Sequence, residues 1–480
     1  MSQGSRLIIV SNRLPVTMER GSGGWEAHTS CGGLVSALLP VFKAAGGFWV
    51  GWPGTDFDPE VEAALQTECA RHYSYEPVFL TEDERAFFYH GCSNEILWPL
   101  FHDLPSPCNF DPAYWTAYGQ ATEKFADAVE RVASSNDFVW VHDYHLMLLA
   151  DALRARNTRC TLAYFHHVPF PAPDTFEKLP WRAEVLRGLL QFDRIGFQTD
   201  RDRRNFVSCI RRFFRSPRVV RTGNRFRVSA EGWETEIGVF PISVDYRNLA
   251  RESRDPWVAA RVEAIKSDFP GAKIILGIDR LDYTKGILER LVAFRALLEK
   301  RPELHGRATL VQVVVPSREL IPRYRELKLQ IEQLVSRING EHGTLGWRPI
   351  AYLHRFIDVQ ELLALYRAAH VALITPIRDG MNLVAKEFCA ARCDEKGVLV
   401  LSEFAGAASE LKAGALLVNP YDSEHMASML CRALMMSESE QRWRMKKIRR
   451  VLANNDLARW CRLCCGEVVL PQAEMLRAAV

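Results

Sequence analysis

Side chains suited to ligand chemistry follow a short apolar run near the end of this sequence of 480 residues. The run VALITP (371–376) precedes RDGMNLVAKE (378–387), in which polar groups stand directly before a helix-forming segment. N–H groups at a helix start lack intrahelical partners and point at whatever lies in front of them. In one interpretation, Asp379, these N–H groups and Glu387 hold an anion, hydroxyls or a ribose diol. In the other, Asp379 caps the helix and Glu387 is a solvated surface acid.

The segment GIDRLDYTKGILER (277–290) places two cations where another apolar run gives way to a helix. Arg280 and Lys285 flank a turn closed by Gly286. Two cations at such a junction form a cradle for a diphosphate, although a solvated loop has the same composition. The run LVQVVV is followed by PSRE, and its Arg318 is a candidate partner for a second phosphate.

The first half of the chain repeats this arrangement with histidines and acids. RLIIV leads to Arg13, DFVWV leads to HDYHL with Asp143, and TLAYF leads to HHVPFP with His167. Titratable groups gathered at strand ends favour a functional site, although Asp143 can equally cap a helix and a lone histidine is usually structural. The H-x-x-H pair of HDYHL lacks further metal ligands nearby, so we expect no bound metal.

Glycine and aromatic residues add weaker signals. SCGGLVSALL places Gly33 at a helix start, where bare N–H groups can approach an anion, or where the loop is simply flexible. The full GxGxxG fingerprint is absent, so a dinucleotide redox cofactor is not expected. Tyr89 and Trp98, in YHGCSNEILWPLFH, have an apolar body and a polar tip suited to sugars and phosphates, but aromatic rings are more often core.

The elements that must position these residues alternate between apolar strands and helices. Helices are predicted over 33–45, 113–133 and 200–214, between short apolar runs. Continuous apolar strands alternating with helices are typical of parallel sheets covered on both faces. The series restarts at EIGVFPI (236–242), which predicts two doubly wound domains. Ligands of such sheets bind beyond the carboxyl ends of the strands, where the residues above stand.

Composition limits the class of protein. The formal net charge is +3 and 48% of residues are hydrophobic, so nothing indicates nucleic acid or an anionic membrane as a partner. No apolar run approaches the roughly 18 residues of a membrane span, and the first residues lack a signal-peptide pattern. The twelve cysteines are scattered, apart from CRLCC (461–465). We therefore expect reduced cysteines in a cytoplasmic protein.

Taken together, these segments closely resemble the trehalose-6-phosphate synthases (UDP-forming) of glycosyltransferase family 20. The resemblance is carried by SNR, CGGL, GWPG, SNEILWP, HDYHL, HHVPFP, GIDRLDYTKG, PSRE, RINGEHGTLGW, RDGMNLVAKE, SEFAGA and VNPYD. It implies an α/β GT-B glycosyltransferase fold, with two Rossmann-like doubly wound domains facing an interdomain cleft. The implied limits are an acceptor-binding domain over 1–235, a nucleotide-sugar-binding domain over 236–455, and a C-terminal helix over 456–480 packing back toward the first domain.

The resemblance also implies an activity for trehalose biosynthesis and osmoprotection. A retaining transferase would move glucose from UDP-glucose to glucose 6-phosphate. The implied catalytic residues are Asp143, His167, Arg280, Lys285 and Asp379. The implied donor-binding residues are Gly33, His167, Arg280, Lys285, Asp379, Gly380, Met381, Asn382, Leu383, Val384 and Glu387. The implied acceptor-binding residues are Arg13, Trp52, Tyr89, Trp98, Asp143 and Arg318.

Front-face attack through an oxocarbenium-like state is the implied route, without a carboxylate nucleophile, a metal or another cofactor. A homo-oligomer, a dimer or a tetramer, is the family expectation. Some features depart from the common pattern: GWPG carries proline where serine is frequent, and FEKLPWR echoes the glucosylglycerol-phosphate synthases, whose acceptor is glycerol 3-phosphate. The alternatives are therefore that acceptor, ADP- or GDP-glucose as donor, or a catalytically silent regulatory homologue.

Overall fold

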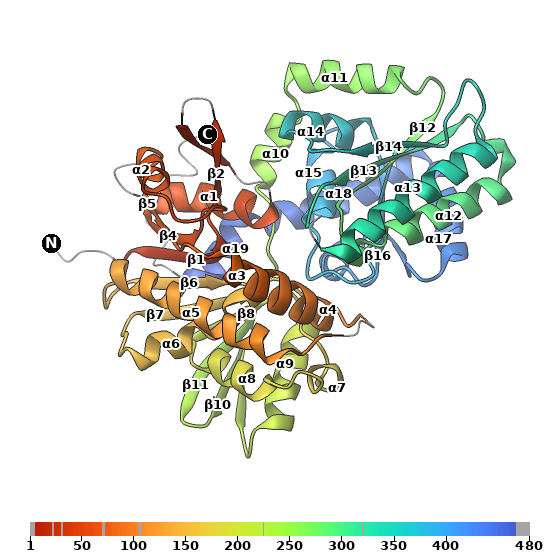
Figure 1. The fold of residues 1–480 in the computed structure, drawn as a ribbon. Coiled ribbons are helices and arrows are strands. Elements are labelled where there is room, and N and C mark those ends of the chain that lie inside the picture. Colours follow the sequence, from red (N-terminus) through yellow and green to blue (C-terminus); the bar gives the residue numbers. More distant parts are fainter. Residues whose placement is uncertain are drawn as a thin grey trace. The chain divides into compact units, whose positions relative to one another are not determined.

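The computed structural model of the protein describes residues 5–21, 24–29, 32–69, 73–104, 108–223, 225–318 and 321–466. The described chain forms two compact units, each built on a β-sheet with helices packed against it (Figure 1). The first unit contains the described residues up to Ile242 and those from Ala458 onward, and the second is Ser243–Leu457.

The main sheet of the first unit has nine strands in the order β5-β4-β1-β6-β7-β8-β11-β10-β9. From β5 to β11 the neighbouring strands are parallel, whereas β9, β10 and β11 are joined by antiparallel pairs. A separate hairpin, β2–β3, completes the strands. The strands are β1 (Leu7–Arg13), β2 (Val16–Gly21), β3 (Gly24–Thr29), β4 (Gly47–Trp52), β5 (Tyr73–Pro77), β6 (Phe138–His142), β7 (Thr161–His166), β8 (Arg194–Phe197), β9 (Arg218–Thr222), β10 (Arg225–Ala230) and β11 (Trp233–Val239).

Helices cover this sheet, and the three that the sequence predicts here are confirmed to within one residue at each end. A π-helical stretch, η1 (Arg85–Leu97), carries the expected aromatic segment, and a short 3-10 helix, η2 (Tyr144–Leu146), follows β6. The other helices are α1 (Gly33–Ala45), α2 (Pro59–Thr67), α3 (Glu82–Glu84), α4 (Trp98–Phe101), α5 (Pro112–Val132), α6 (Leu149–Ala155), α7 (Pro173–Phe176), α8 (Arg182–Leu190), α9 (Asp200–Phe213) and α19 (Leu457–Cys465).

The strand expected to open the second domain belongs instead to the first sheet. β11 pairs in parallel with β8, from Glu236 opposite Arg194 to Val239 opposite Phe197. The division between the units therefore falls after Ile242, rather than at the predicted residue 236. An apolar strand that ends one sheet has the same composition as one that opens the next, so the sequence pattern cannot separate the two cases.

The sheet of the second unit is entirely parallel, in the order β14-β13-β12-β15-β16-β17. Its strands are β12 (Lys273–Arg280), β13 (Ala308–Val315), β14 (Ile350–His354), β15 (Val371–Ile374), β16 (Val398–Ser402) and β17 (Leu416–Val418). Its helical elements are α10 (Tyr246–Glu252), α11 (Pro256–Ser267), η3 (Tyr283–Lys285), α12 (Ile287–Lys300), η4 (Pro302–Leu304), α13 (Pro322–His342), α14 (Val359–Ala368), α15 (Leu383–Ala391), α16 (Ala408–Leu411), α17 (Ser423–Met435) and α18 (Glu438–Asn454).

Each sheet contains a point where the strand order reverses. In the first unit the chain runs outward from β1 through β4 to β5, then returns to place β6 on the other side of β1. In the second it runs from β12 through β13 to β14, then returns to place β15 on the other side of β12. Loops leaving the two central strands on opposite sides open a crevice at the carboxyl edge, the usual ligand position in such sheets.

A buried arginine joins three strands of the second sheet. The Arg290 side chain, from α12, is 0% exposed and forms an ion pair of 2.6 Å with Asp279 of β12. It also donates to Gln312 Oε1 of β13 at 3.1 Å and to Thr375 Oγ1, just after β15, at 3.2 Å. Burial raises the pKa of Asp279, although Arg290 and Lys285 oppose the shift. Because this charge pair is fully desolvated, loss of one partner leaves the other uncompensated.

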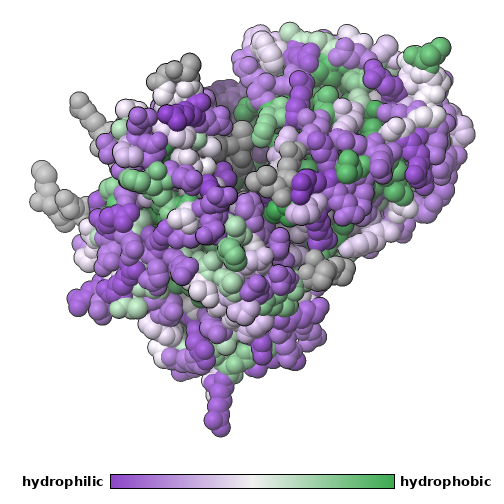
Figure 2. Space-filling view, in the orientation of Figure 1, coloured by the Kyte–Doolittle hydropathy of each residue, from purple (hydrophilic) through white to green (hydrophobic). Residues whose placement is uncertain are grey.

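No helix among the described residues is long and apolar enough to cross a membrane. On the face drawn in Figure 2, hydrophilic residues predominate and hydrophobic ones appear in small groups.

We expect Arg290→Met to lower the free energy of unfolding of the second unit by about 3–5 kcal/mol, because Asp279 stays buried without its cation. Denaturant or thermal unfolding measures the change. The matched control is Arg295→Met on the same helix, whose ion pair with Glu299 is partly exposed; its cost should stay below about 1 kcal/mol. Equal losses in both variants would contradict the role given to the buried pair.

Candidate functional site

The reversal point of the second sheet is occupied by an ion pair. Lys285 ends η3, directly after β12, and Asp379 follows β15. Lys285 Nζ lies 2.7 Å from Asp379 Oδ2, and the two side chains are 12% and 14% exposed. The two motifs singled out in the sequence are thus joined by a partly desolvated charge pair at the carboxyl edge of the sheet.

Two glycines let the loops around this pair approach each other. Gly286 has φ 62°, and a Cβ there would lie 2.1 Å from the carbonyl oxygen of Thr375. A Cβ on Gly406, in the loop after β16, would lie 1.8 Å from the carbonyl oxygen of Gly380. A side chain at either position would force the strand-end loops apart, since real Cβ contacts are never so short.

The helix cap after Asp379 is Asn382, not Asp379. Asn382 adopts a left-handed conformation with φ 82°, and its Oδ1 accepts from the N–H of Ala385 at 3.0 Å. Its Nδ2 donates to Asp379 Oδ2 at 3.1 Å. The capping interpretation of Asp379 is therefore wrong, and the carboxylate stays beside Lys285. The N–H groups of Leu383 and Val384 open α15, where helices leave such donors without intrahelical partners.

Glu387 is not a solvated surface acid. Its Oε2 accepts a hydrogen bond of 2.8 Å from the hydroxyl of Tyr366, a residue of α14 that is 1% exposed. Burial raises the pKa of Glu387, and the hydrogen bond from Tyr366 opposes that shift. The carboxylate is therefore held in one orientation two helical turns beyond the start of α15.

Cations gather where β12 and β13 end. Burial alone would raise the pKa of Asp282, but Arg318, Lys285 and Arg280 outweigh it and the pKa is lowered. Arg318, with φ 52°, reaches Asp282 at 3.7 Å and donates to the hydroxyl of Tyr324 at 2.8 Å. Arg280 is exposed, and no hydrogen bond or ion pair within 4 Å engages its guanidinium in the described part of the chain. The group is suited to a polyanion such as a diphosphate.

In the first unit, Arg13, Trp52 and Tyr89 form a connected cluster. The register pairs Arg13 at the end of β1 with Trp52 at the end of β4, and the guanidinium lies 4.4 Å from the indole ring centre. Trp52 and Tyr89 have ring centres 6.4 Å apart, and Tyr89 stacks on His145 at 6.0 Å. A cation held against an aromatic ring can receive a sugar phosphate.

Asp143 and His167 meet where β6 and β7 end. Asp143, with φ 74°, accepts from the N–H of His167 at 3.3 Å. The ring of His167 lies between Gln198 Nε2, 3.4 Å from its Nδ1, and His142 Nδ1, 3.0 Å from its Nε2. Gln198 Oε1 accepts from the N–H of Ile242 at 2.9 Å, so its amide donates to His167. His167 therefore carries its proton on Nε2 and donates to His142.

The remaining predicted residues of the first unit differ in exposure. Gly33 is exposed at the first position of α1, with Gly32 before it. Trp98 is 5% exposed, with its ring centre 4.1 Å from that of His102 and 5.8 Å from that of Tyr144. Gly380 and Met381 are buried in the loop before α15.

Sequence reasoning missed several groups that position the predicted ones. Lys285, Asp379, Asn382 and Glu387 are placed around α15 as the motif suggested, but Tyr366 was not selected. Gln198 and Asp282 were also missed, because amides and acids inside ordinary helical or loop sequence carry no signal of the partner they meet. A weak signal was present for Asp282, which stands between two cations in RLDYTK.

The sequence model of glycosyltransferase family 20 matches residues 5–468. The chain belongs to glycosyltransferase family 20. Among curated relatives, the UDP-forming α,α-trehalose-phosphate synthase of Candida albicans is 40% identical over 93% of this chain and 94% of its own length. The UDP-forming α,α-trehalose-phosphate synthase A of Dictyostelium discoideum is 39% identical over 95% of this chain, which spans 61% of that longer protein.

Solved structures of family members share the fold. A trehalose-6-phosphate synthase structure from E. coli, described as bound with UDP-2-fluoro glucose, is 35% identical, with a TM-score of 0.87 over 97% of this chain and 99% of its own. The UDP-forming α,α-trehalose-phosphate synthase of Burkholderia xenovorans, in complex with glucose-6-phosphate, is 33% identical, with a TM-score of 0.88 over 97% and 100%. The predicted GT-B fold is confirmed.

Two buried histidines and one half-buried histidine of the first unit predict acid sensitivity of this family 20 chain. Burial lowers the pKa of His166 and His167 to about 3 and moves the pKa of His142 in the same direction. Below pH 6.5 these histidines are protonated in the unfolded chain but stay neutral in the folded chain. The free energy of unfolding therefore falls as the pH drops from about 6.5 toward 3. Each histidine contributes at most about 1.4 kcal/mol per pH unit.

The comparison is the fall in melting temperature from pH 7.5 to 5.5 for the wild type and for His166→Gln. The variant should show a smaller fall in melting temperature, because it lacks one imidazole whose pKa is lowered in the folded chain. This expectation does not depend on the variant's stability at pH 7.5. His28→Gln, at an exposed site of the same unit, should keep the full fall. An unchanged fall in His166→Gln would contradict the assignment.

Proposed function

We propose that the protein transfers glucose from UDP-glucose to glucose 6-phosphate, giving α,α-trehalose 6-phosphate and UDP with retention at the anomeric carbon. The observation that carries the proposal is the Lys285–Asp379 pair at the reversal point of the second sheet. Membership of family 20 and the names of its relatives support the same reaction.

We assign the donor mainly to the second unit. The diphosphate would meet Arg280, Lys285 and the N–H groups of Leu383 and Val384, with Gly33 supplying a further backbone contact. Asp379 and the backbone of Gly380, Met381 and Asn382 would hold the glucose hydroxyls, and His167 would contact the same sugar. Glu387, oriented by Tyr366, would accept the ribose hydroxyls.

The acceptor is assigned to Arg13, Tyr89 and Arg318 for its phosphate, with Trp98 beside them, and to Asp143 and Trp52 for its sugar. Arg13 stacked on Trp52 supports this assignment, because the ring fixes the cation while leaving its donors to a phosphate. The Burkholderia xenovorans relative in complex with glucose-6-phosphate supports this acceptor over glycerol 3-phosphate.

The chemical step breaks the bond between the anomeric carbon and the phosphate oxygen. UDP leaves with the bonding electron pair, and Arg280, Lys285 and the helix N–H groups stabilise the charge that develops on it. The acceptor hydroxyl attacks the oxocarbenium-like carbon from the face that UDP leaves. Its proton passes to the departing phosphate oxygen, so atoms and charge balance without a carboxylate nucleophile.

Location in the cytoplasm and assembly as a homo-oligomer belong to this proposal and rest on the family resemblance. Size measurement in solution and localisation of the tagged full chain test them directly.

Removing the cation of the central pair should slow the reaction while the fold survives. We expect Lys285→Met to lower kcat by about 100-fold or more, because a fixed charge at the leaving group is lost. Steady-state kinetics measures the loss, and Lys266→Met, at an exposed ion pair of the same unit, is the control with unchanged kcat. Near-normal turnover of Lys285→Met would refute the leaving-group role.

A substrate matrix tests the proposed reaction as a whole. UDP-, ADP- and GDP-glucose are each combined with glucose 6-phosphate and glycerol 3-phosphate, and nucleotide release is measured with and without excess EDTA. UDP-glucose with glucose 6-phosphate should react fastest and should be insensitive to EDTA. A faster glycerol 3-phosphate reaction would change the acceptor, loss of activity in EDTA would contradict metal-free transfer, and no release in any combination would favour a silent homologue.

A further inference from the structure

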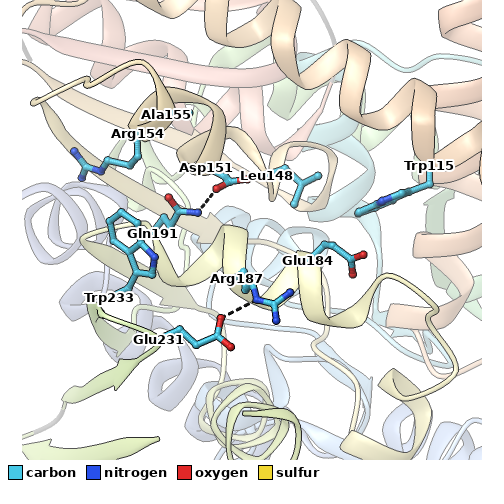
Figure 3. Close-up of a pocket in the computed structure, with 10 residues that line it drawn as sticks. All are labelled: Trp115, Leu148, Asp151, Arg154, Ala155, Glu184, Arg187, Gln191, Glu231 and Trp233. Carbon is cyan, nitrogen blue, oxygen red and sulfur yellow. Dashed lines mark hydrogen bonds and ion pairs between the residues drawn. The ribbon is translucent and has the colours of Figure 1, made fainter. Parts of the chain in front are cut away.

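A cavity of about 590 Å³ opens in the helical layer of the first unit. Its walls come from the start of α5, from α6 and α8, and from the turn between β10 and β11 (Figure 3; orange to yellow-green in Figure 1). None of the residues that line it is assigned above to the donor or the acceptor. Its volume is in the range of small-molecule sites.

A tryptophan stands at each end of this cavity, as Figure 3 shows. Trp115 is fixed by stacking on Trp181, with ring centres 4.9 Å apart and planes at 4°, and on Tyr118 at 5.1 Å. Trp233 is 40% exposed and presents its indole to the cavity from the β10–β11 turn. Neither indole N–H has a hydrogen-bond partner among the described residues, so each end offers apolar surface together with a donor.

The polar side chains between the tryptophans are held by one another. Gln191 donates to Asp151, and Arg187 donates to Glu231 at 2.7 Å (dashed lines in Figure 3). Glu231 has φ 50°, a conformation that glycine or asparagine adopts more easily, and the ion pair keeps its carboxylate on the cavity wall. Glu184 makes no hydrogen bond or ion pair within 4 Å in the described part of the chain, and its carboxylate points into the same space.

The charge of the lining disfavours phosphorylated ligands. Three carboxylates, of Asp151, Glu184 and Glu231, face two guanidiniums, and both guanidiniums are already paired: Arg187 with Glu231, and Arg154 with Asp193 at 2.8 Å. Both cations of the lining are thus already engaged by carboxylates, and the Glu184 carboxylate repels a phosphate. Carboxylate, amide and indole groups instead exchange hydrogen bonds with neutral hydroxyls.

We propose that this cavity binds a neutral saccharide of two sugar rings, separately from the transferase substrates. The indole face of Trp233 packs on the C–H face of one ring, and the N–H edge of Trp115 reaches the hydroxyls of the other. Asp151, Glu184 and Arg187 bind hydroxyls between them. The inference is independent of the proposed reaction, since it depends on binding alone.

Saturation-transfer NMR of the full chain, with UDP and glucose 6-phosphate in excess to fill the proposed substrate site, measures binding of maltose and α,α-trehalose. Glucose 1-phosphate serves as the anionic probe. We expect at least one of the disaccharides to bind, and Trp233→Ala to weaken it by about tenfold or more through lost stacking. Trp257→Ala, at an exposed tryptophan of α11 in the second unit, is the matched control and should bind as the wild type does.

Glu184→Gln separates charge from shape. It should leave disaccharide binding within about threefold, because an amide replaces one hydrogen-bonding group with another, while glucose 1-phosphate binds more tightly than to the wild type. Both substituted side chains are on the surface, so the variants fold. No binding of either disaccharide at tens of millimolar, equal binding in Trp233→Ala and Trp257→Ala, or tighter binding of glucose 1-phosphate than of the disaccharide to the wild type would each overturn the proposal.

Discussion

The Lys285–Asp379 ion pair is the interaction on which the second unit's carboxyl edge depends. It joins the loops that leave β12 and β15 on opposite sides, at the point where the strand order reverses. Gly286 and Gly406 remove the side chains that would keep the backbones apart, and the left-handed Asn382 turns the chain so that α15 starts beside the pair. The glycines, the left-handed Asn382 and the ion pair together set the geometry of this edge.

Beneath that pair, charges alternate from the core to the surface. Arg290 pairs with Asp279 inside the sheet, and Lys285 and Asp379 both act on the pKa of Asp279 from above. An opposite charge nearby offsets part of the desolvation cost of a buried charge. Each charged side chain of the series therefore lowers the cost of burying its neighbour. In the proposed reaction a diphosphate would add a further negative group to this series. Lys285 would then interact with both Asp379 and the diphosphate.

The sequence predicts the elements and the strand-end residues well, because both depend on local pattern: apolar runs, helix-forming segments and glycines at turns. It fails where the deciding partner is distant along the chain. The RDGMN segment offers Asp379 as a helix cap, but Asn382 is the cap and Asp379 instead binds Lys285, 94 positions earlier. The sequence alone does not decide whether Glu387 is a surface acid, because its hydrogen-bond partner Tyr366 lies 21 positions earlier in the chain. β11 joins the first sheet because β8 is there to pair with it, which no property of its own residues reveals.

The two units handle polar groups at their strand ends by different means. In the second, cations and acids balance one another, so the edge is suited to an incoming polyanion. In the first, burial keeps His142 and His167 neutral, and the imidazoles interact by hydrogen bonds without contributing charge. Neutral imidazoles add no positive charge at the ends of β6 and β7. In the proposed reaction, the charged edge of the second unit would stabilise the leaving diphosphate, and Arg13 would be the cation of the first unit that receives the acceptor phosphate.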